Sequence, residues 1–145
     1  MTPRSSLWLA CALSLSVAAC SGSSGSESHG FTGAPLGVFT SDRVGLRVSV
    51  RSDPSPPARG VNAVELFVVD QTGAPRDGLQ LKIVPWMPAH GHGASVTPSI
   101  TARGGGRYVA DDVDLYMPGR WELRTTITGL EGAGEDHVAP TFDVR

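Results

Sequence analysis

The chain has 145 residues, of which 40% are hydrophobic, and a formal net charge of −2 at pH 7. Because the sequence has no cluster of basic residues, we expect no binding to nucleic acid, which needs a concentrated positive surface to neutralise phosphates. The length leaves room for one small domain with a modest core once the N-terminal segments are set aside.

Residues 1–19 have the pattern of a secretory signal peptide. One charged residue, Arg4, precedes the apolar run LWLACALSLSVAA. This order of a charged region and an apolar region is typical of such signals. The run is too short to span a membrane as a helix. The protein is therefore expected to leave the cytoplasm.

The signal ends in VAAC, with small residues directly before Cys20. This ending resembles the lipobox of bacterial lipoproteins, which implies that the signal is cut before Cys20 and that Cys20 carries a diacylglycerol. An ordinary signal peptide cut nearby is the alternative. Ser21 follows instead of aspartate, which favours the outer membrane. We predict a lipid-anchored protein of the cell envelope that faces the periplasm or the cell exterior.

The two cysteines of the chain are both accounted for by this processing. Cys11 would leave with the signal and Cys20 would carry lipid, so the mature domain would have neither a disulfide nor a free thiol. Any soft metal chemistry must therefore use methionine and histidine.

Residues 20–43 are predicted to be the lipidated N-terminus and a flexible tether. They are rich in serine and glycine and poor in bulky apolar side chains, so they bury too little surface to offset the entropy of ordering. The folded domain is expected over residues 44–145.

This domain is predicted to be all-β. Short segments of alternating hydrophobic and polar residues are separated by turns rich in glycine and proline, and no stretch has helical spacing. We predict an immunoglobulin-like antiparallel β-sandwich of about seven strands; an α+β domain with a helix is the alternative. The predicted strands cover residues 44–50, 62–70, 79–86, 95–102, 107–116, 120–128 and 138–144.

Two loops of this predicted sandwich carry methionine and histidine. The loop after the third strand, WMPAHGHG, contains Met87, His90 and His92, and the turn after the fifth strand, YMPG, contains Met117. If successive strands reverse direction, both loops emerge at the same end. We call these four residues the Met/His cluster. By the same reasoning the tether would enter at the opposite end, so the cluster would face away from the membrane.

Thioethers and imidazoles together form a soft ligand set that contains nitrogen. This set favours Cu(I), and the imidazoles would also accept Cu(II), whereas zinc prefers thiolate, imidazole or carboxylate. Because imidazole must be neutral to bind a metal, the affinity is expected to fall as the pH drops below about 6.5. The alternative is structural: the methionines fill gaps in the core, and the histidines are exposed.

The segments WMPAHGHG and GGGRYVADDVDLYMPGRWELRTTI resemble the YtkA-like domain family, whose members carry an M-P-x-M/H-G-H loop and a later M-P-G-x-W turn. The resemblance covers residues 59–145. It implies an immunoglobulin-like fold and a looser similarity to the FixH and CopC groups, which are associated with copper handling or oxidase assembly. The motif positions fall on Met87, His90, His92, Met117 and Trp121. Where some members have a second methionine in the first loop, this chain has His90, which makes the ligand set harder.

Two functions remain open at this point. The first is a lipid-anchored copper-binding protein that buffers copper or delivers it to an extracytoplasmic acceptor. The second is an accessory domain of a cell-envelope complex that binds no metal and uses WMPAHGHG as a contact loop. The acidic run DDVD, at residues 111–114, offers oxygen ligands to calcium but is more typical of a solvated strand face. No nucleophile with a base and an orienting partner is evident, so we expect no enzymatic activity.

Overall fold

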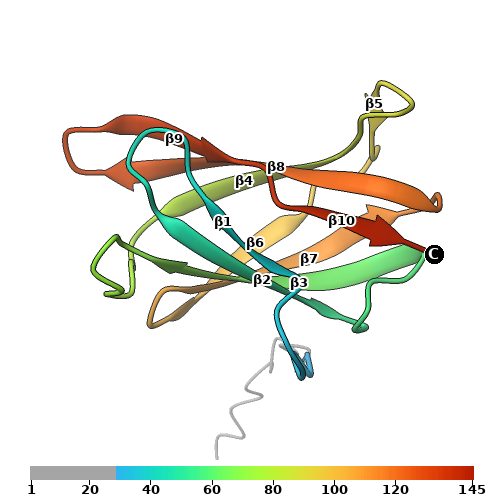
Figure 1. Ribbon diagram of the computed structural model, residues 1–145, viewed down its shortest axis with the longest axis horizontal. Helices are drawn as coiled ribbons and strands as arrows, with labels where there is room; N and C mark the ends of the chain where they lie inside the picture. Colours follow the sequence, from blue (N-terminus) through green and yellow to red (C-terminus); the bar gives the residue numbers. More distant parts are fainter. Residues whose placement is uncertain (1–28) are drawn as a thin grey trace, which may run out of the picture.

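The computed structural model describes residues 29–145, in which all regular structure is β (Figure 1). The predicted signal peptide and Cys20 lie outside this range. Within it no helix is long and apolar enough to cross a membrane. The strands of the described part are β1 (Gly37–Thr40), β2 (Arg47–Asp53), β3 (Gly60–Val69), β4 (Gln80–Met87), β5 (His92–Gly93), β6 (Ser99–Gly104), β7 (Arg107–Leu115), β8 (Gly119–Leu130), β9 (Gly134–Val138) and β10 (Thr141–Val144).

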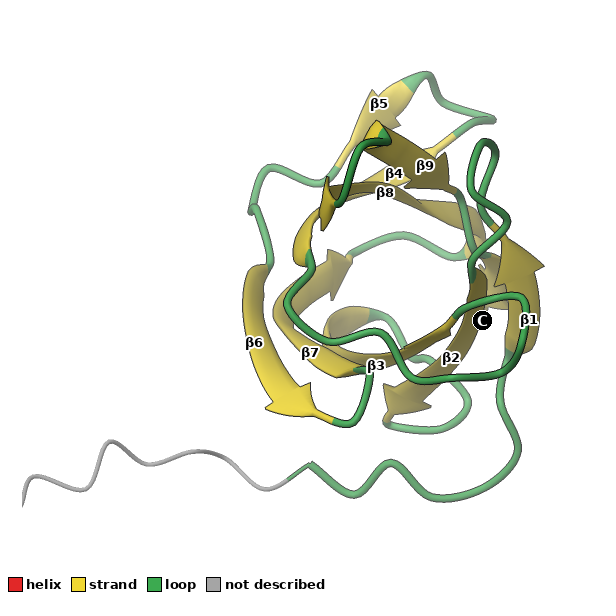
Figure 2. Cartoon of the chain, turned by 90° about the vertical axis from the view of Figure 1, so that its left-hand side faces the viewer, coloured by secondary structure: helices red, strands yellow, loops and turns green. Residues whose placement is uncertain are grey.

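These strands form two antiparallel sheets that pack face to face. One sheet has the order β1-β2-β3-β7-β6, and the other has the order β10-β8-β4-β5, with β9 also paired to β8. Figure 2 looks along the strands and shows the two layers. The all-β sandwich expected from the sequence is therefore confirmed.

Alternation of side chains along each strand produces the core between the sheets. In β2, Val48 and Val50 are fully buried, and in β8 Trp121, Leu123 and Ile127 are fully buried. Their neighbours along each strand face outward, as the period of two requires. The inward faces of the first and sixth predicted strands are therefore those expected from the pattern.

The number and limits of the strands differ from the sequence prediction. The sheet begins at Gly37, before the expected boundary at Val44, because β1 adds an edge strand whose Phe39 packs against the core. The loop after β4 contains the additional two-residue strand β5. The seventh predicted strand is shortened to β10, and β9 forms mostly from residues that precede it. The two are separated at Pro140, which has no backbone N–H to donate to β8.

The additional strand β1 reverses the side from which the chain enters the sandwich. Gly37 pairs with Val50, near the end of β2, and Thr40 pairs with Arg47, at its start. The end of β2, the start of β3 and the end of β7 lie together. The chain thus enters β1 at the end from which the loops after β4 and β7 emerge. The expectation that the tether enters at the opposite end was wrong, because it omitted one strand.

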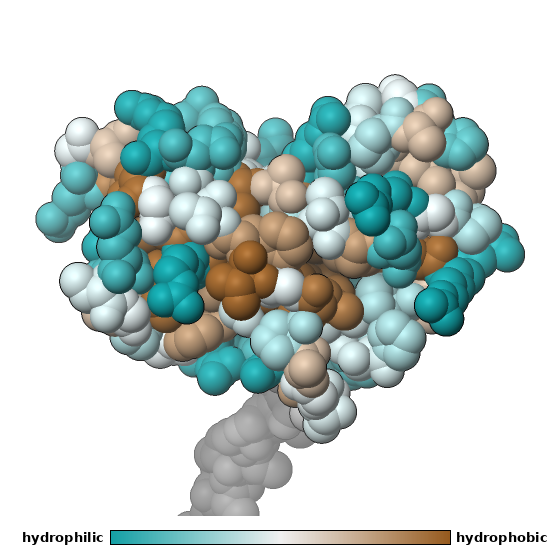
Figure 3. All heavy atoms as spheres, in the orientation of Figure 1, coloured by the Kyte–Doolittle hydropathy of each residue, from teal (hydrophilic) through white to brown (hydrophobic). Residues whose placement is uncertain are grey.

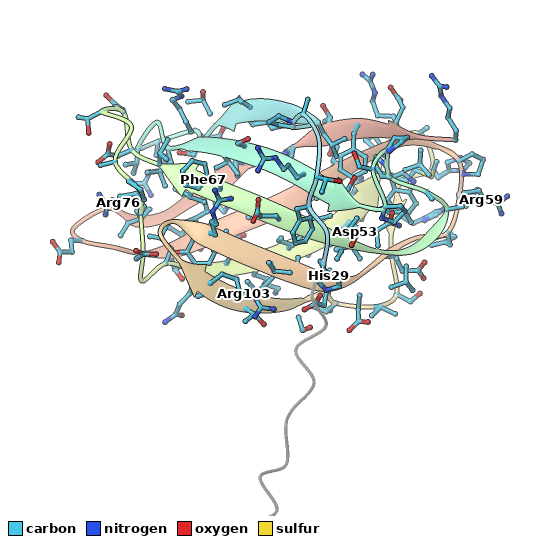
Figure 4. All side chains as sticks on the ribbon, turned by 90° about the horizontal axis from the view of Figure 1, so that it is seen from below. His29, Asp53, Arg59, Phe67, Arg76 and Arg103 are labelled. Atoms are coloured by element: carbon cyan, nitrogen blue, oxygen red, sulfur yellow. The ribbon has the colours of Figure 1, made fainter. Side chains whose placement is uncertain are left out.

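The residues before β1 cross the outer face of the first sheet (Figure 4). His29 Nε2 lies 2.6 Å from Asp111 Oδ1 on β7, and His29 Nδ1 lies 3.8 Å from Asp53 Oδ2 on β2. The backbone N–H of Gly30 also donates to Asp53 Oδ2, at 2.9 Å. This part of the predicted tether is therefore held against the sheet.

The edge strand β1 and the residue before it leave hydrophobic side chains accessible. Figure 3 shows such residues in the middle of the molecule, in the region where Figure 1 places β1 and β10. Leu36 and Phe39 are partly buried against the core, and Val38 is 57% exposed. Single exposed hydrophobic residues are normal on a protein surface.

A buried carboxylate fixes the loop between β1 and β2 to β9. Asp136 is 0% exposed, and it accepts hydrogen bonds from Ser41 Oγ at 2.6 Å and from the backbone N–H groups of Arg43, Val44 and His137 at 2.8–3.0 Å. Burial acts to raise the pKa of Asp136, but the four hydrogen bonds outweigh it, so the pKa lies below its ordinary value of 3.8.

Replacing Asp136 by Asn is expected to lower the free energy of unfolding at pH 7 by about 2 kcal/mol or more, because an amide cannot satisfy the same set of buried donors. Because the pKa of Asp136 is lower in the folded state than in the unfolded state, its ionised carboxylate stabilises the fold above about pH 4. This contribution is lost as the pH falls through the folded-state pKa. In urea denaturation, the difference in free energy of unfolding between the unsubstituted protein and Asp136→Asn should therefore become smaller as the pH is lowered. The control is Asp143→Asn, whose carboxylate is 62% exposed beside Arg120; equal losses in both variants would contradict the role of the network.

Candidate metal centre

The two histidines of the cluster lie at the tip of the hairpin formed by β4 and β5. The backbone N–H groups of His90 and Gly91 both donate to the carbonyl of Met87, at 3.1 and 3.0 Å, which closes a tight turn. Gly91 has φ +69°, a conformation that glycine adopts without strain. Immediately after the turn, His92 pairs with Met87. His90 and His92 are exposed, and their ring centroids are 5.6 Å apart.

The second motif is the turn from β7 into β8. Trp121 is fully buried, and its indole Nε1–H donates to the carbonyl of Met117 at 2.9 Å. This bond fixes the Met117-Pro118 turn to the core. The Met117 side chain is partly buried against the same core.

The two motifs are in direct contact through Tyr116. Its hydroxyl lies 2.7 Å from Nδ1 of His92, and the two rings are stacked, with centroids 6.0 Å apart and an interplanar angle of 14°. On its other side, Tyr116 meets the Trp121 ring edge-to-face at 5.5 Å. Both distances lie in the favourable range for ring pairs. The structure therefore brings the two loops together at one end, as the strand order predicted.

The two methionines have different environments. Met87 is 2% exposed and belongs to the hydrophobic core, whereas Met117 is partly exposed. A Cβ on Gly119 would lie 2.7 Å from Cε of Met87, so the Met87 side chain reaches under the second turn. Complete burial of such a side chain stabilises the fold by about 1.5–3 kcal/mol. Met87 thus supports the two motifs from within the core.

The tryptophans that flank the motifs point to opposite faces of their sheet. Trp121 faces the core, whereas Trp86 lies half-buried on the outer face, with the guanidinium of Arg124 4.3 Å from its ring centroid. Glu122 holds this guanidinium through a 3.1 Å hydrogen bond. Trp121 therefore binds the turn of the second motif, whereas the outward-facing ring of Trp86 packs against Arg124.

The tip provides two imidazoles but not a complete metal site by itself. Two rings that bind one ion through nitrogens about 2.0–2.1 Å away have centroids roughly 5 Å apart, close to the separation of His90 and His92. Within residues 29–145, no group of three His, Cys, Asp or Glu side chains is placed to hold a metal ion. The turn beside the hairpin tip adds the partly exposed thioether of Met117 to this end of the sandwich.

Tyr116 was not among the site residues predicted from the sequence. It directly precedes the Met117-Pro118 pair, and its position at the end of β7 is the only sequence feature that could have placed it beside the hairpin tip. Nothing in the sequence indicated that its hydroxyl would contact His92.

The model of the YtkA-like family matches residues 42–126, which is more than half of the chain, and the chain therefore belongs to this family. No curated protein matches it in sequence. Among solved structures, it is similar to a copper-bound variant of FetP from uropathogenic Escherichia coli strain F11, with a TM-score of 0.49 and 9% identity over 76% of this chain and 95% of that chain. FetP of the same strain as isolated gives a TM-score of 0.48 and 10% identity over 79% and 95%.

Replacing Gly119 by Ala is expected to lower the free energy of unfolding by about 1–3 kcal/mol, because Gly119 has φ +127°, a conformation that strains an L-residue. The new Cβ would also displace Met87. The control is Gly73→Ala, at φ +89° with nothing within 4 Å of its Cβ position. The loss in urea denaturation should be larger for Gly119→Ala, and equal losses would show that Met87 does not constrain the second turn.

Proposed function

We propose that this YtkA-like protein binds copper at the Met/His end of the sandwich and acts in extracytoplasmic copper handling or in the assembly of an oxidase-type complex, without catalysis. His90, His92 and Met117 are the ligands in this proposal. The observation that carries it is the contact between the two motifs, because Tyr116 connects the imidazole pair directly to the turn that holds Met117.

The composition of the ligand set supports copper over other metals. Two imidazoles and one thioether contain no hard oxygen ligand, which disfavours calcium and magnesium, and the thioether favours Cu(I) over zinc. When bound, the copper ion would be the cargo of the protein. The exposure of both histidines suits transfer to another protein, because an acceptor can approach the ion without opening the core.

Met87 has a supporting role in this proposal. Its side chain packs in the core beneath both turns, and a thioether that left the core to bind copper would forfeit the free energy of its burial. We therefore assign to Met87 a packing role in the core beneath the site, and to Met117 the role of a ligand.

The predicted lipid at Cys20 completes the proposal. A lipid anchor would hold the protein at a membrane in the cell envelope, with the outer membrane favoured by Ser21, and the tether would let the sandwich reach a copper acceptor or an envelope complex. The chain enters β1 at the Met/His end, so the site and the attachment of the tether share one end of the domain.

Copper binding can be measured by titrating the full-length protein in detergent with Cu(I) against a competing chelator. We expect one ion per chain, and an affinity at least about tenfold weaker in His90→Ala and in Met117→Leu, since even the loss of an outer partner of a ligand costs that much. Binding of more than one chain per ion would instead place the site between two copies. Absence of binding would overturn the proposal and favour a metal-free accessory domain that uses the hairpin tip as a contact surface.

Met87→Leu distinguishes the roles of the two methionines. The substitution nearly conserves volume, so it is expected to cost less than about 1.5 kcal/mol of stability, and to leave the Cu(I) affinity within a few-fold of the unsubstituted protein. The same loss of affinity in Met87→Leu as in Met117→Leu would make Met87 a ligand and contradict its assignment to the core.

Membrane attachment is tested by Cys20→Ser. In a bacterial host that processes lipoproteins, the unsubstituted protein is expected in the membrane fraction with incorporated labelled fatty acid, and the variant without label. Equal labelling of both proteins, or none in either, would contradict anchoring through Cys20.

A further inference from the structure

We propose that Tyr116 is the positioning residue of this site: its phenol oxygen accepts the Nδ1–H of His92, holds the ring in that tautomer, and leaves the lone pair on Nε2 to bind the metal. The role toward copper depends on the proposed function. The tautomer itself is a property of the protein without metal.

The position of the phenol determines which nitrogen of His92 is available. The Tyr116 hydroxyl is 2.7 Å from Nδ1, so this nitrogen already has a hydrogen-bond partner. The hydroxyl is also oriented to donate to the carbonyl of Gly93, at 3.5 Å. A phenol has a single proton. We assign that proton to the Gly93 carbonyl, so that the oxygen accepts from Nδ1–H at 2.7 Å; donation to Nδ1 would instead leave the hydrogen of His92 on Nε2, and ¹⁵N NMR distinguishes the two.

The tautomer with hydrogen on Nδ1 has its free lone pair on Nε2. A neutral imidazole has one nitrogen that donates and one that accepts, and a metal ion requires the nitrogen without hydrogen. Histidines that bind metals typically donate their other N–H to a protein acceptor, which fixes the ring and raises the basicity of the ligating nitrogen. Tyr116 supplies such an acceptor to His92. The structure shows no equivalent hydrogen bond to the ring of His90 within the described residues.

Tyr116 is itself held in place from the core side. Its ring lies between the stacked ring of His92 and the edge-to-face ring of Trp121, and Trp121 is fully buried. Because the position of Trp121 is fixed by the core, the phenol oxygen has a defined location at the surface. His92 is therefore oriented before any ligand arrives, and His90 is the ring that remains free to adjust.

The tautomer can be observed directly by ¹⁵N NMR of the metal-free, full-length protein labelled at histidine. Resonances of His92 are assigned by comparison with His92→Gln. We expect the hydrogen of His92 on Nδ1, and a shift toward the Nε2–H form in Tyr116→Phe, which keeps the ring but removes the oxygen. A predominant Nε2–H form in the unsubstituted protein would overturn the proposal, as would an unchanged tautomer in Tyr116→Phe.

A matched control is Thr126→Val, which removes a hydroxyl 3.4 Å from Nδ1 of a different histidine, His137. This variant should leave the His92 resonances unchanged. Unfolding in urea and the near-ultraviolet circular dichroism of the aromatic residues show whether Tyr116→Phe remains folded. If it unfolds, the tautomer of the unsubstituted protein still decides the question.

The second readout is Cu(I) affinity, which we expect to be about tenfold to 100-fold weaker in Tyr116→Phe and unchanged in Thr126→Val. An unchanged affinity in Tyr116→Phe would overturn the positioning role. If the unsubstituted protein binds no copper, the proposed function fails, but the NMR result still tests the tautomer. The two failures are therefore distinguishable.

Discussion

The geometry of the Met/His end depends on one buried side chain, Trp121. Its ring is fully buried between the sheets, its indole N–H holds the carbonyl of Met117, and its ring edge supports Tyr116, which in turn contacts His92. The order of contacts runs from the core to the solvent without interruption. A surface loop rich in glycine and proline thus acquires a fixed position because it is connected to an element that cannot move independently of the fold.

Much of the fold could be predicted from the sequence, since alternation with a period of two is a direct consequence of strand geometry. Three features were not predictable in this way. The strand β1 is only four residues long within a segment whose overall composition is typical of a linker. The pairing of β5 involves two residues on each strand, too few to produce a pattern. The division between β9 and β10 depends on Pro140, whose effect appears only when its partner strand β8 is known.

The candidate site was predictable in part for a different reason. The ligand types in the two motifs and the parity of the strands were sufficient to bring Met117 to the same end as His92. The same counting of strands also gave the wrong end for the tether. Because β1 was not detected, the chain was expected to enter the sandwich at the end opposite to the one it uses. The burial of Met87 was missed because the predicted strand ended at residue 86, whereas β4 includes Met87 and its alternation places Met87 on the same inward face as Ile83. Tyr116 was missed because a tyrosine at a strand end has no pattern that identifies its partner.

The pairing of β10 with β8 has a practical consequence for handling the protein. Val144 pairs with Gly119, so anything joined after Arg145 emerges beside the turn that carries Met117, at the right of Figure 1, at the same end of the sandwich as the hairpin tip. A polyhistidine purification tag at this terminus would present competing imidazoles next to the candidate ligands, and a fluorescent fusion partner would obstruct their access to solvent. Affinity tags removed by proteolysis, or epitopes inserted in the exposed turn around Gly73 at the far end of the sandwich, would keep the chemistry of this surface unaltered.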